Sequence, residues 1–490
     1  MADPAELGAK AHSIRGLLLM AVLVGVAYFL LVRELEFLVD DAFINFRYAK
    51  NLARGHGLRF NLGESPPVEA YDLLWTLLMA IPELFRWNTP ELSKLVTVSC
   101  GATLVFAIAR TAYRRSGPDL LVSGATVMLV ATLPIFAAWS TSGMETMPAA
   151  LLVFAVYERL LADPDRPRGW QAGMFAVAAA LMRPDGFVMT GTVIFAAGLS
   201  AWMFRESKLR KAVLRAACLL VVCTVLHTCW RLWYHGDWIS NPTRIKGEFS
   251  CLSVERGYEY VASLLLAFPG LPLALLPVLL AVLRGERREW FPLIVICFLL
   301  VTVVITAGGD WMPMGRFLVV VVPFFALLFA HGLASMLRRG VRRVWIPSLA
   351  ASCIGLSLPS AFDLHIVTKT VRERVNFRWG LELTSERAEL ETSRRLVERC
   401  ELESRATALF THAGESMIRG GIGVYGYRTD LELLDCFGLV DPEVARRPTP
   451  PGRRIIAGHT KMVEVGYFFR ASRPICQPCW SMARSQPCSS

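Results

Sequence analysis

The chain has 490 residues, of which 54% are hydrophobic and only 19% are charged, and its mean hydropathy is +0.43. A soluble protein of this length would carry roughly a quarter of its residues as charged side chains. The apolar residues gather in blocks long enough to cross a bilayer. The composition therefore excludes a disordered chain, a coiled coil and an ordinary cytosolic enzyme, and it indicates a polytopic membrane protein.

The formal net charge of +11 comes mainly from Lys and Arg residues that directly follow apolar blocks. Short basic loops between spans are typical of the cytoplasmic side of a membrane. The positive charge therefore indicates topology, and we expect no nucleic acid partner. The basic groups are Arg114-Arg115, Arg166 with Arg168, Lys208 with Arg210-Lys211, Arg287-Arg288, and Arg338-Arg339 with Arg342-Arg343.

Hydropathy predicts eleven transmembrane helices, of which the first is an uncleaved anchor with a cytoplasmic N-terminus. A further apolar segment, Leu73–Phe85, is interpreted as an interfacial or re-entrant helix. Counting it as a span would move Arg114-Arg115 to the outer side, against the positive-inside rule. The predicted spans are Gly16–Val32, Leu95–Tyr113, Leu120–Trp139, Met147–Leu161, Gly169–Met182, Phe187–Phe204, Ala212–Trp230, Leu264–Leu283, Trp290–Ala307, Phe317–Leu337 and Val344–Ser360.

The hydropathy falls after Ser360, so residues 361–490 are predicted to form a soluble extracytoplasmic domain behind a membrane domain of residues 1–360. In this tail, Ser385–Arg399 has the pattern of a charged surface helix, whereas Thr407–Phe410 and Leu431–Leu434 look like strands. The expected fold class is an α-helical polytopic membrane protein with a small C-terminal α/β domain.

This topology places every short loop rich in acids, aromatics, Gly and Pro on the outer side. Carboxylates at a membrane surface are costly and usually functional, so these loops are the candidate site. They are Asp40-Asp41, Ser142–Thr146, Arg183–Gly186, Tyr234–Thr243 and Gly308–Arg316.

The pair Asp40-Asp41 lies near the start of the outward loop 33–94. Apolar residues then follow at helical spacing, namely Ala42, Phe46, Ala49 and Ala53. This spacing predicts an amphipathic helix lying at the membrane surface. One Asp could cap that helix, but two adjacent acids repel each other, which favours a functional role. The carboxylate could act as a general base toward an acceptor hydroxyl or bind a hard divalent cation, and the residues leave both roles open.

The same residues resemble the GT-C glycosyltransferases that use polyprenyl-phosphate-linked sugars, and they look most like the mycobacterial terminal arabinofuranosyltransferases and their bacterial relatives. The similarity extends from Asp40 to Trp75, and motifs in the later outward loops and the tail follow in the expected order. The chain departs from the family at Ala70, at Pro66-Pro67 and at Trp238–Pro242, which bears on sugar and acceptor identity more than on reaction class. The similar motifs are Gly143-Met144-Glu145-Thr146, Arg183-Pro184-Asp185-Gly186, Gly308-Gly309-Asp310-Trp311 with Arg316-Phe317, Tyr234-His235-Gly236-Asp237 with Asn241-Pro242, Asp435-Cys436-Phe437-Gly438-Leu439 with Asp441-Pro442, and Gly458-His459 with Lys461.

The resemblance implies an inverting transfer of a sugar, arabinofuranose being one candidate, from a polyprenyl-phosphate donor to a cell-envelope glycan or glycoprotein. It implies a place in the bacterial cytoplasmic (inner) membrane, with the active site and the tail on the periplasmic side. Asp41 is then the preferred base with Asp40 as its partner, although the residues themselves do not separate the two.

By the same resemblance, the donor phosphate would be bound by Arg316 and Arg183. Arg316 could instead reach the membrane interface as many span-end arginines do, and Arg183 could merely pair with Asp185. The implied sugar- and acceptor-binding residues include aromatics that could equally belong to an interfacial belt. These residues are Asp310, Glu69, Tyr71, Trp311, Asp237, Glu145, His459 and Lys461.

Two other classes of function stay open: a flippase or other transporter, and a non-catalytic binder of lipid-linked saccharides. Acids in outward loops rather than at the bilayer midplane favour the enzyme. Cys476 and Cys479 form a single CxxC pair, so no zinc site is expected, and no nucleotide-binding motif is found. An oxidising compartment would permit disulfides among the outer cysteines Cys251, Cys400, Cys436, Cys476, Cys479 and Cys488.

Overall fold

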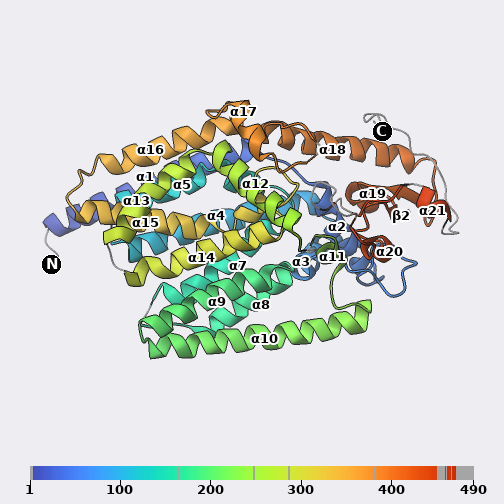
Figure 1. Ribbon diagram of the computed structural model, residues 1–490, viewed down its shortest axis with the longest axis horizontal. Coiled ribbons are helices and arrows are strands. Elements are labelled where there is room, and N and C mark those ends of the chain that lie inside the picture. Colours follow the sequence, from blue (N-terminus) through green and yellow to red (C-terminus); the bar gives the residue numbers. More distant parts are fainter. Residues whose placement is uncertain are drawn as a thin grey trace.

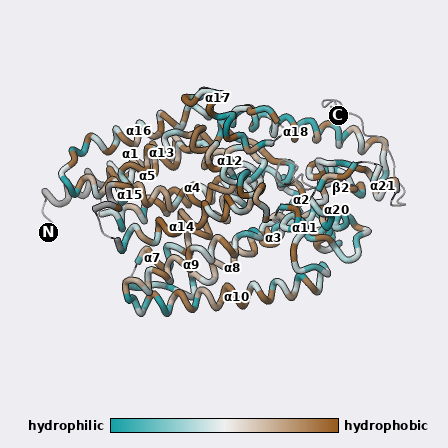
Figure 2. The backbone as a smooth tube through the Cα atoms, in the orientation of Figure 1, coloured by the Kyte–Doolittle hydropathy of each residue, from teal (hydrophilic) through white to brown (hydrophobic). Residues whose placement is uncertain are grey.

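The computed structural model describes residues 4–117, 119–163, 165–246, 249–284, 287–379, 381–449, 458, 461–464 and 466–470. Most of these residues are helical. The long helices form a bundle, and α2, α3 and α11 lie at the same end of it as α19, α20 and α21 (Figure 1). Hydrophobic residues follow the bundle, whereas α18 and the region around α20 are more hydrophilic (Figure 2).

The bundle and its connecting elements run from the N-terminus to Phe362. They comprise α1 (Pro4–Glu34), α2 (Asp40–Ala53), α3 (Leu73–Leu84), α4 (Thr89–Arg115), α5 (Leu120–Ala131), α6 (Pro134–Trp139), α7 (Thr146–Leu161), α8 (Gly169–Met182), α9 (Gly186–Met203), α10 (Ser207–His235), α11 (Asn241–Lys246), α12 (Cys251–Ala267), α13 (Gly270–Arg284), α14 (Arg287–Thr306), the 3₁₀ turn η1 (Arg316–Leu318), α15 (Val322–Arg338), α16 (Trp345–Ser357) and η2 (Leu358–Phe362).

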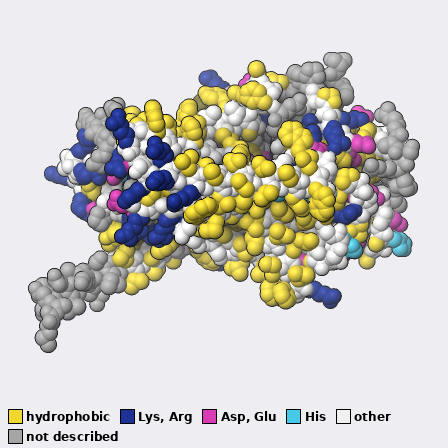
Figure 3. Space-filling view, turned by 90° about the horizontal axis from the view of Figure 1, so that it is seen from below, with side chains coloured by type: hydrophobic (Ala, Val, Ile, Leu, Met, Phe, Trp, Pro, Cys, Tyr) yellow, Lys and Arg dark blue, Asp and Glu magenta, His cyan; other side chains and the backbone are white. Residues whose placement is uncertain are grey.

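Six helices in the described part of the chain are long and apolar enough to cross a membrane, and a bent pair, α12 with α13, would make a seventh. These helices confirm a multi-pass membrane protein. The full count of eleven spans stays a prediction, because several of the predicted spans correspond to shorter helices. Figure 3 shows the broad hydrophobic surface of the bundle and a gathering of Lys and Arg at one end of it.

Two of the predicted spans are not single straight helices. The segment Leu264–Leu283 was expected to be one span, but α12 ends at Ala267 and α13 leaves it at 93°. Pro269 lies in the break and has no N–H to continue the helical bonding. Leu120–Trp139 divides in the same way just before Pro134, which disfavours helical conformation in the residue that precedes it.

The helix predicted after Asp40 is present as α2, but protein covers most of its side chains, and its position at the membrane surface stays a prediction. Helix α2 is enclosed between α3 and α19, and even Arg47 on its polar face is only 4% exposed. The Arg47 guanidinium donates to the carbonyl oxygens of Phe60 (2.6 Å) and Leu431 (2.7 Å), so its charge is buried with its donors satisfied.

The C-terminal part contains one long helix and a small parallel sheet. In the sheet, Ser416–Arg419 pairs with Glu432–Asp435, which confirms a strand near Leu431–Leu434. The strand expected at Thr407–Phe410 is wrong, because the helix predicted from Ser385 continues to Thr407. The elements are α17 (Lys369–Arg372), η3 (Glu373–Val375), α18 (Glu386–Thr407), β1 (Ser416–Arg419), α19 (Gly423–Arg428), β2 (Glu432–Asp435), α20 (Pro442–Ala445) and α21 (Gly466–Arg470).

One continuous hydrophobic cluster joins the bundle to the C-terminal part. It includes Phe43 and Phe46 of α2, which lie within 6 Å of the Tyr427 ring of α19, and it reaches Leu390 and Val397 of α18. The C-terminal part is therefore packed onto the outward loop 33–94, and this packing determines the geometry of the candidate site.

Candidate functional site

The predicted outward loops meet around the residues Ser142–Glu145. The backbone N–H of Val39 donates to the carbonyl of Ser142 (3.3 Å), and the Trp75 indole donates to the carbonyl of Gly143 (3.2 Å). The start of α2 and the start of α3 are thereby fixed against the loop between α6 and α7.

The two adjacent acids at the start of α2 have different environments. Asp40 is buried, and its carboxylate accepts hydrogen bonds from the backbone N–H groups of Gly423 (3.1 Å) and Val424 (2.9 Å) at the start of α19. Burial raises the pKa of Asp40, and the neighbouring Asp41 raises it further, although the two backbone bonds act the other way. Asp41 is partly exposed, and within the described residues its carboxylate has no hydrogen-bond or ion-pair partner.

Arg316 and Asp310 form a buried ion pair in the loop between α14 and α15. Their atoms Nε and Oδ2 are 2.7 Å apart, and the side chains are 5% and 1% exposed. Among the described residues, the one hydrogen-bond partner of Arg316 Nη1 is the thioether sulfur of Met144 (3.3 Å), which is a weak acceptor. Arg316 begins the turn η1, which precedes the first turn of α15.

Arg183 is held by two carboxylates. Its Nε and Nη2 each lie 2.8 Å from an oxygen of Asp185, and its Nη1 lies 3.6 Å from Glu145. The guanidinium carbons of Arg183 and Arg316 lie 5.5 Å and 4.9 Å from the centre of the Phe317 ring. The structure thus brings both predicted phosphate-binding arginines to one aromatic side chain, but Arg183 is already well satisfied.

Asp72 was not among the predicted site residues, although it directly precedes an apolar helix in the first outward loop. Its carboxyl interacts with that of Glu145, and Asn45 donates to it over 3.2 Å. Burial and the charge of Glu145 raise the pKa of Asp72 well above its ordinary value. Because Glu145 Oε2 is buried without a donor, a proton held between the two carboxyls would satisfy both side chains.

Asp310 is surrounded by positive charge. Burial by itself would raise the pKa of Asp310, but Arg316, Lys246 and Arg183 together lower it below the ordinary value. Arg256 also lies within electrostatic range, and its Nε donates to the carbonyl of Gly308 (2.8 Å). Asp310 is therefore a stable anion among several cations.

The positive charges near Asp310 are only partly neutralised by other acids. Arg183 has Asp185 and Glu145, and Arg378 has an ion pair with Glu389. Among the described residues, Arg316 and Lys246 both act on Asp310, so two cations share this carboxylate. This excess of positive charge suits an anionic group such as a phosphate.

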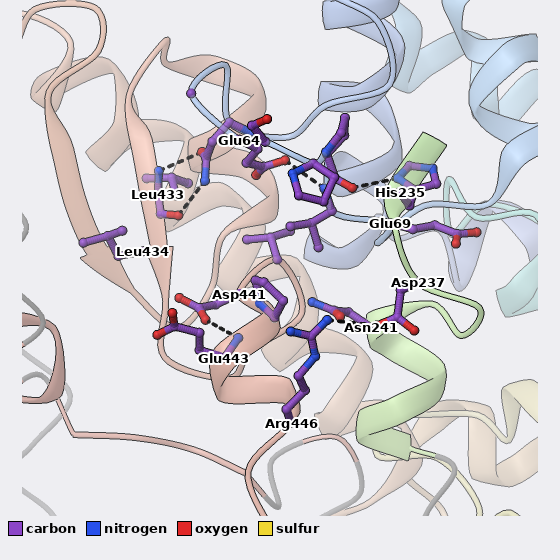
Figure 4. A pocket seen from close by; sticks show the side chains of 18 of the residues that line it. Glu64, Glu69, His235, Asp237, Asn241, Leu433, Leu434, Asp441, Glu443 and Arg446 are labelled. Carbon is purple, nitrogen blue, oxygen red and sulfur yellow. Dashed lines mark hydrogen bonds and ion pairs between the residues drawn. The ribbon is translucent and has the colours of Figure 1, made fainter. Parts of the chain in front are cut away.

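Glu69 and Asp237, both predicted to bind sugar, line a separate cavity of about 500 Å³. It lies between the loop 61–69, the α10–α11 connection and the β2–α20 region, as Figure 4 shows. Its lining has six carboxylates against one arginine and one histidine. The ionisable residues that line it are Glu64, Glu69, His235, Asp237, Glu432, Asp441, Glu443 and Arg446.

Two of these six acids form ion pairs with arginines. Glu69 forms an ion pair with Arg231 (2.6 Å), and Asp237 forms ion pairs with Arg244 (2.8 Å) and Arg446 (3.2 Å). Asn241 is 5% exposed, and it lies beside Arg446 in Figure 4.

The Asn241 amide nitrogen donates to the carbonyl of Gly438 (3.4 Å), whereas its carbonyl oxygen accepts no bond from the described residues. Sequence reasoning did not select Asn241, and the Asn241-Pro242 pair in an outward loop was the available signal.

Of the other predicted site residues, some lie near the cavity, some lie near Asp310, and one is outside the described residues. Tyr71 is buried rather than at a membrane belt, and its hydroxyl lies 2.9 Å from His235 Nε2. Trp311 is beside Gly458 of the tail, next to Asp310. Lys461 is 8% exposed and donates to the carbonyl of Ala445 (2.9 Å), and His459 lies outside the described residues.

No group of three or more His, Cys, Asp or Glu side chains in the described ranges is placed to hold a metal ion. Among the described residues, Cys251 and Cys400 are free thiols. Cys476, Cys479 and Cys488 lie outside the described residues.

No protein-family model matches the chain, and no curated protein matches its sequence. Two solved structures of ArnT from Cupriavidus metallidurans are similar in fold. The one bound to undecaprenyl phosphate is 12% identical over 90% of this chain and 89% of ArnT, with a TM-score of 0.55. The apo structure is 14% identical over 86% of each chain, with a TM-score of 0.50. At these identities the similarity concerns architecture, and the chain has the GT-C membrane fold of ArnT.

Proposed function

We propose that the protein is a membrane glycosyltransferase that moves a sugar from a polyprenyl-phosphate carrier to a hydroxyl group of an outward-facing saccharide. The observation that carries this proposal is that the start of α2 and Arg316 both contact the loop 142–145, through Val39 to Ser142 (3.3 Å) and through Arg316 to Met144 (3.3 Å). Among the described residues, the Asp41 carboxylate at the start of α2 has no partner, and Arg316 is a buried cation whose Nη1 has only a weak acceptor. A base and an anion-binding group placed together are what such a transfer needs.

In the proposed reaction, Asp41 takes the proton of the acceptor hydroxyl as its oxygen attacks the anomeric carbon of the donor sugar. The bond between that carbon and the phosphate oxygen breaks, and the electron pair leaves with the polyprenyl phosphate. Attack opposite to the leaving group inverts the anomeric configuration. Arg316 donates to the departing phosphate, and Lys246 and Arg256 add positive charge around it.

Asp310 has a positioning role in this proposal, because its ion pair fixes the Arg316 side chain (2.7 Å). Arg183 is a weaker candidate for the phosphate than the sequence indicated, since Asp185 and Glu145 occupy its donors. We place it as a rigid support for Phe317, against which Arg316 also packs.

We assign the acceptor to the cavity lined by Glu69, Asp237 and Asn241. Carboxylates and amides form paired hydrogen bonds with sugar hydroxyls, and the side-chain oxygen of Asn241, which accepts no bond from the described residues, is available to accept one. The excess of carboxylates in the lining disfavours an anionic ligand, so the donor phosphate belongs to the cluster around Arg316 rather than here.

The fold of ArnT, whose structure was determined with undecaprenyl phosphate, supports a polyprenyl-phosphate donor. The motif resemblance supports a pentose such as arabinofuranose as the sugar and a cell-envelope glycan or glycoprotein as the acceptor. The basic end of the bundle, opposite the site, supports a place in the bacterial inner membrane with the site on the periplasmic side (Figure 3).

The direct test is turnover by the purified protein in detergent or nanodiscs with a panel of synthetic polyprenyl-phosphate sugars. Formation of a glycosylated acceptor and free polyprenyl phosphate, lost in Asp41→Asn, is the expected result. Translocation of the intact donor across a liposome without transfer would instead favour a flippase. Donor binding without turnover on any acceptor would favour a non-catalytic binder.

A further inference from the structure

A second charged concavity lies on the bundle far from the outward loops. It has a volume of about 140 Å³ and is formed where the ends of α4 and α7 meet the loop that leads to α8. Its charged lining consists of five arginines and two acids, namely Arg110, Arg114, Arg159, Arg166, Arg168, Glu158 and Asp163.

The two acids leave most of the arginines without a carboxylate partner. Glu158 is used by Arg110 (2.8 Å) and also accepts from the Thr111 hydroxyl (2.9 Å). No ion pair joins Arg114, Arg159, Arg166 or Arg168 to an acid among the residues that the structure describes, and the Nε of Arg159 is buried without an acceptor.

Arginines in the last turn of a helix also offset its dipole, which accounts for Arg114 at the end of α4. The helix dipole does not explain why arginines from α4, from α7 and from the loop that leads to α8 line the same concavity. Planar guanidinium groups that converge from several elements match the oxygens of a phosphate.

The surroundings indicate that this phosphate belongs to a lipid. Phe106 lies one turn before Arg110 on the same face of α4, and its side chain is 69% exposed. On the other side, Trp170 follows Arg168 at the start of α8 and is 60% exposed. Exposed aromatic side chains beside basic ones are typical of the headgroup level of a membrane.

From these contacts we infer that the concavity between α4 and α7 binds the phosphate of an anionic phospholipid, whose acyl chains lie over Phe106. The basic residues at this end place the site in the cytoplasmic leaflet. The inference concerns a lipid of the surrounding bilayer and does not depend on the proposed transferase activity.

The test is native mass spectrometry of the detergent-purified full-length protein titrated with phosphatidylglycerol, with phosphatidylcholine as the zwitterionic comparison and inorganic phosphate as the free anion. We expect a defined phosphatidylglycerol adduct that is weakened about tenfold or more in the double variant Arg114→Gln/Arg168→Gln. The matched control is Lys208→Gln/Arg210→Gln, which removes the same charge from exposed positions in the first turn of α10, outside the concavity.

Phe106→Ser distinguishes the source of the phosphate. It should weaken phosphatidylglycerol binding and leave any binding of inorganic phosphate unchanged. Equal binding of phosphatidylglycerol and phosphatidylcholine, an equal loss in the two double variants, or saturation by inorganic phosphate alone would overturn the inference. Circular dichroism and thermal unfolding of each variant show whether the fold is intact.

Discussion

The Asp40 carboxylate accepts a hydrogen bond from the backbone N–H of Val424, which is 2.9 Å away and 384 residues later in the chain. A second bond from Gly423 completes the cap of α19. Asp40 therefore connects the first outward loop to the C-terminal part, and Asp41 beside it remains available for chemistry. The two adjacent aspartates thus have different roles, because Asp40 has hydrogen-bond partners in α19.

Substitutions of Asp41 and Asp40 are expected to affect different properties, the first the rate of transfer and the second the stability. Asp41→Asn should lower kcat by about 10² to 10⁴, the usual contribution of a positioned base, with the melting temperature unchanged. Asp40→Ala should lower stability by about 1–3 kcal/mol, because it leaves the Gly423 and Val424 N–H groups unsatisfied.

Both variants are compared by turnover of a lipid-linked sugar and by thermal unfolding in the same detergent. A fully active Asp41→Asn protein would remove Asp41 as the base. An Asp40→Ala protein as stable as the parent would show that the cap is energetically unimportant.

Because Arg316 and Asp310 form a buried ion pair, a second substitution at Asp310 should restore stability, but not activity, to an Arg316 variant. Arg316→Gln leaves Asp310 buried without its main partner, so stability should fall by about 3–5 kcal/mol and transfer should be lost. Adding Asp310→Asn should restore most of the stability without restoring transfer, because the donor to the phosphate is still missing. Thermal unfolding and turnover of the two single variants and the double variant measure this separation; a double variant that regains transfer would exclude Arg316 as the phosphate ligand.

Glu64 predicts a pH dependence of stability. Burial raises its pKa from 4.5 to about 7, against two backbone bonds from Asn61 (3.0 Å) and Val68 (3.2 Å) that lower it. A raised pKa means that the folded protein holds the proton more tightly than the unfolded chain does. The contribution of Glu64 is therefore complete below about pH 4.5 and is lost as the pH rises through about 7.

The measurement is the melting temperature of the parent and of Glu64→Gln at pH values from 5 to 8. We expect the parent to lose stability relative to Glu64→Gln as the pH rises. Asp435 also has a pKa raised to about 7 by burial, so only the difference between the two proteins at each pH is assigned to Glu64. A constant difference across this range would contradict the prediction.

Substitution of Asn241 should change the KM for the acceptor but not the KM for the donor. Asn241→Ala removes the free carbonyl oxygen from the cavity, so the KM for the acceptor should rise about three- to tenfold while the KM for the donor stays unchanged. Asn88→Ala, in an exposed cap of α4, is the matched control. An equal rise in both KM values would place Asn241 outside the acceptor site.

The membrane character of the protein follows from the sequence alone. Hydropathy and the position of basic residues are properties of each segment against lipid and water, so they predicted helices such as α4, α9 and α10 and selected the outward loops without reference to packing. The same logic predicted α2 as a helix, because Ala42 and Phe46 have its periodicity, and Asp310 as an outward acid.

The tertiary structure decided which of these residues have partners. The burial of α2 depends on carbonyl groups of Phe60 and Leu431 that satisfy Arg47, and the distinction between Asp40 and Asp41 depends on α19. The cavity around Asn241 likewise combines the loop 61–69, α11 and α20. Hydrogen bonds between segments hundreds of residues apart form only when the packed core brings the segments together, so local sequence cannot specify them.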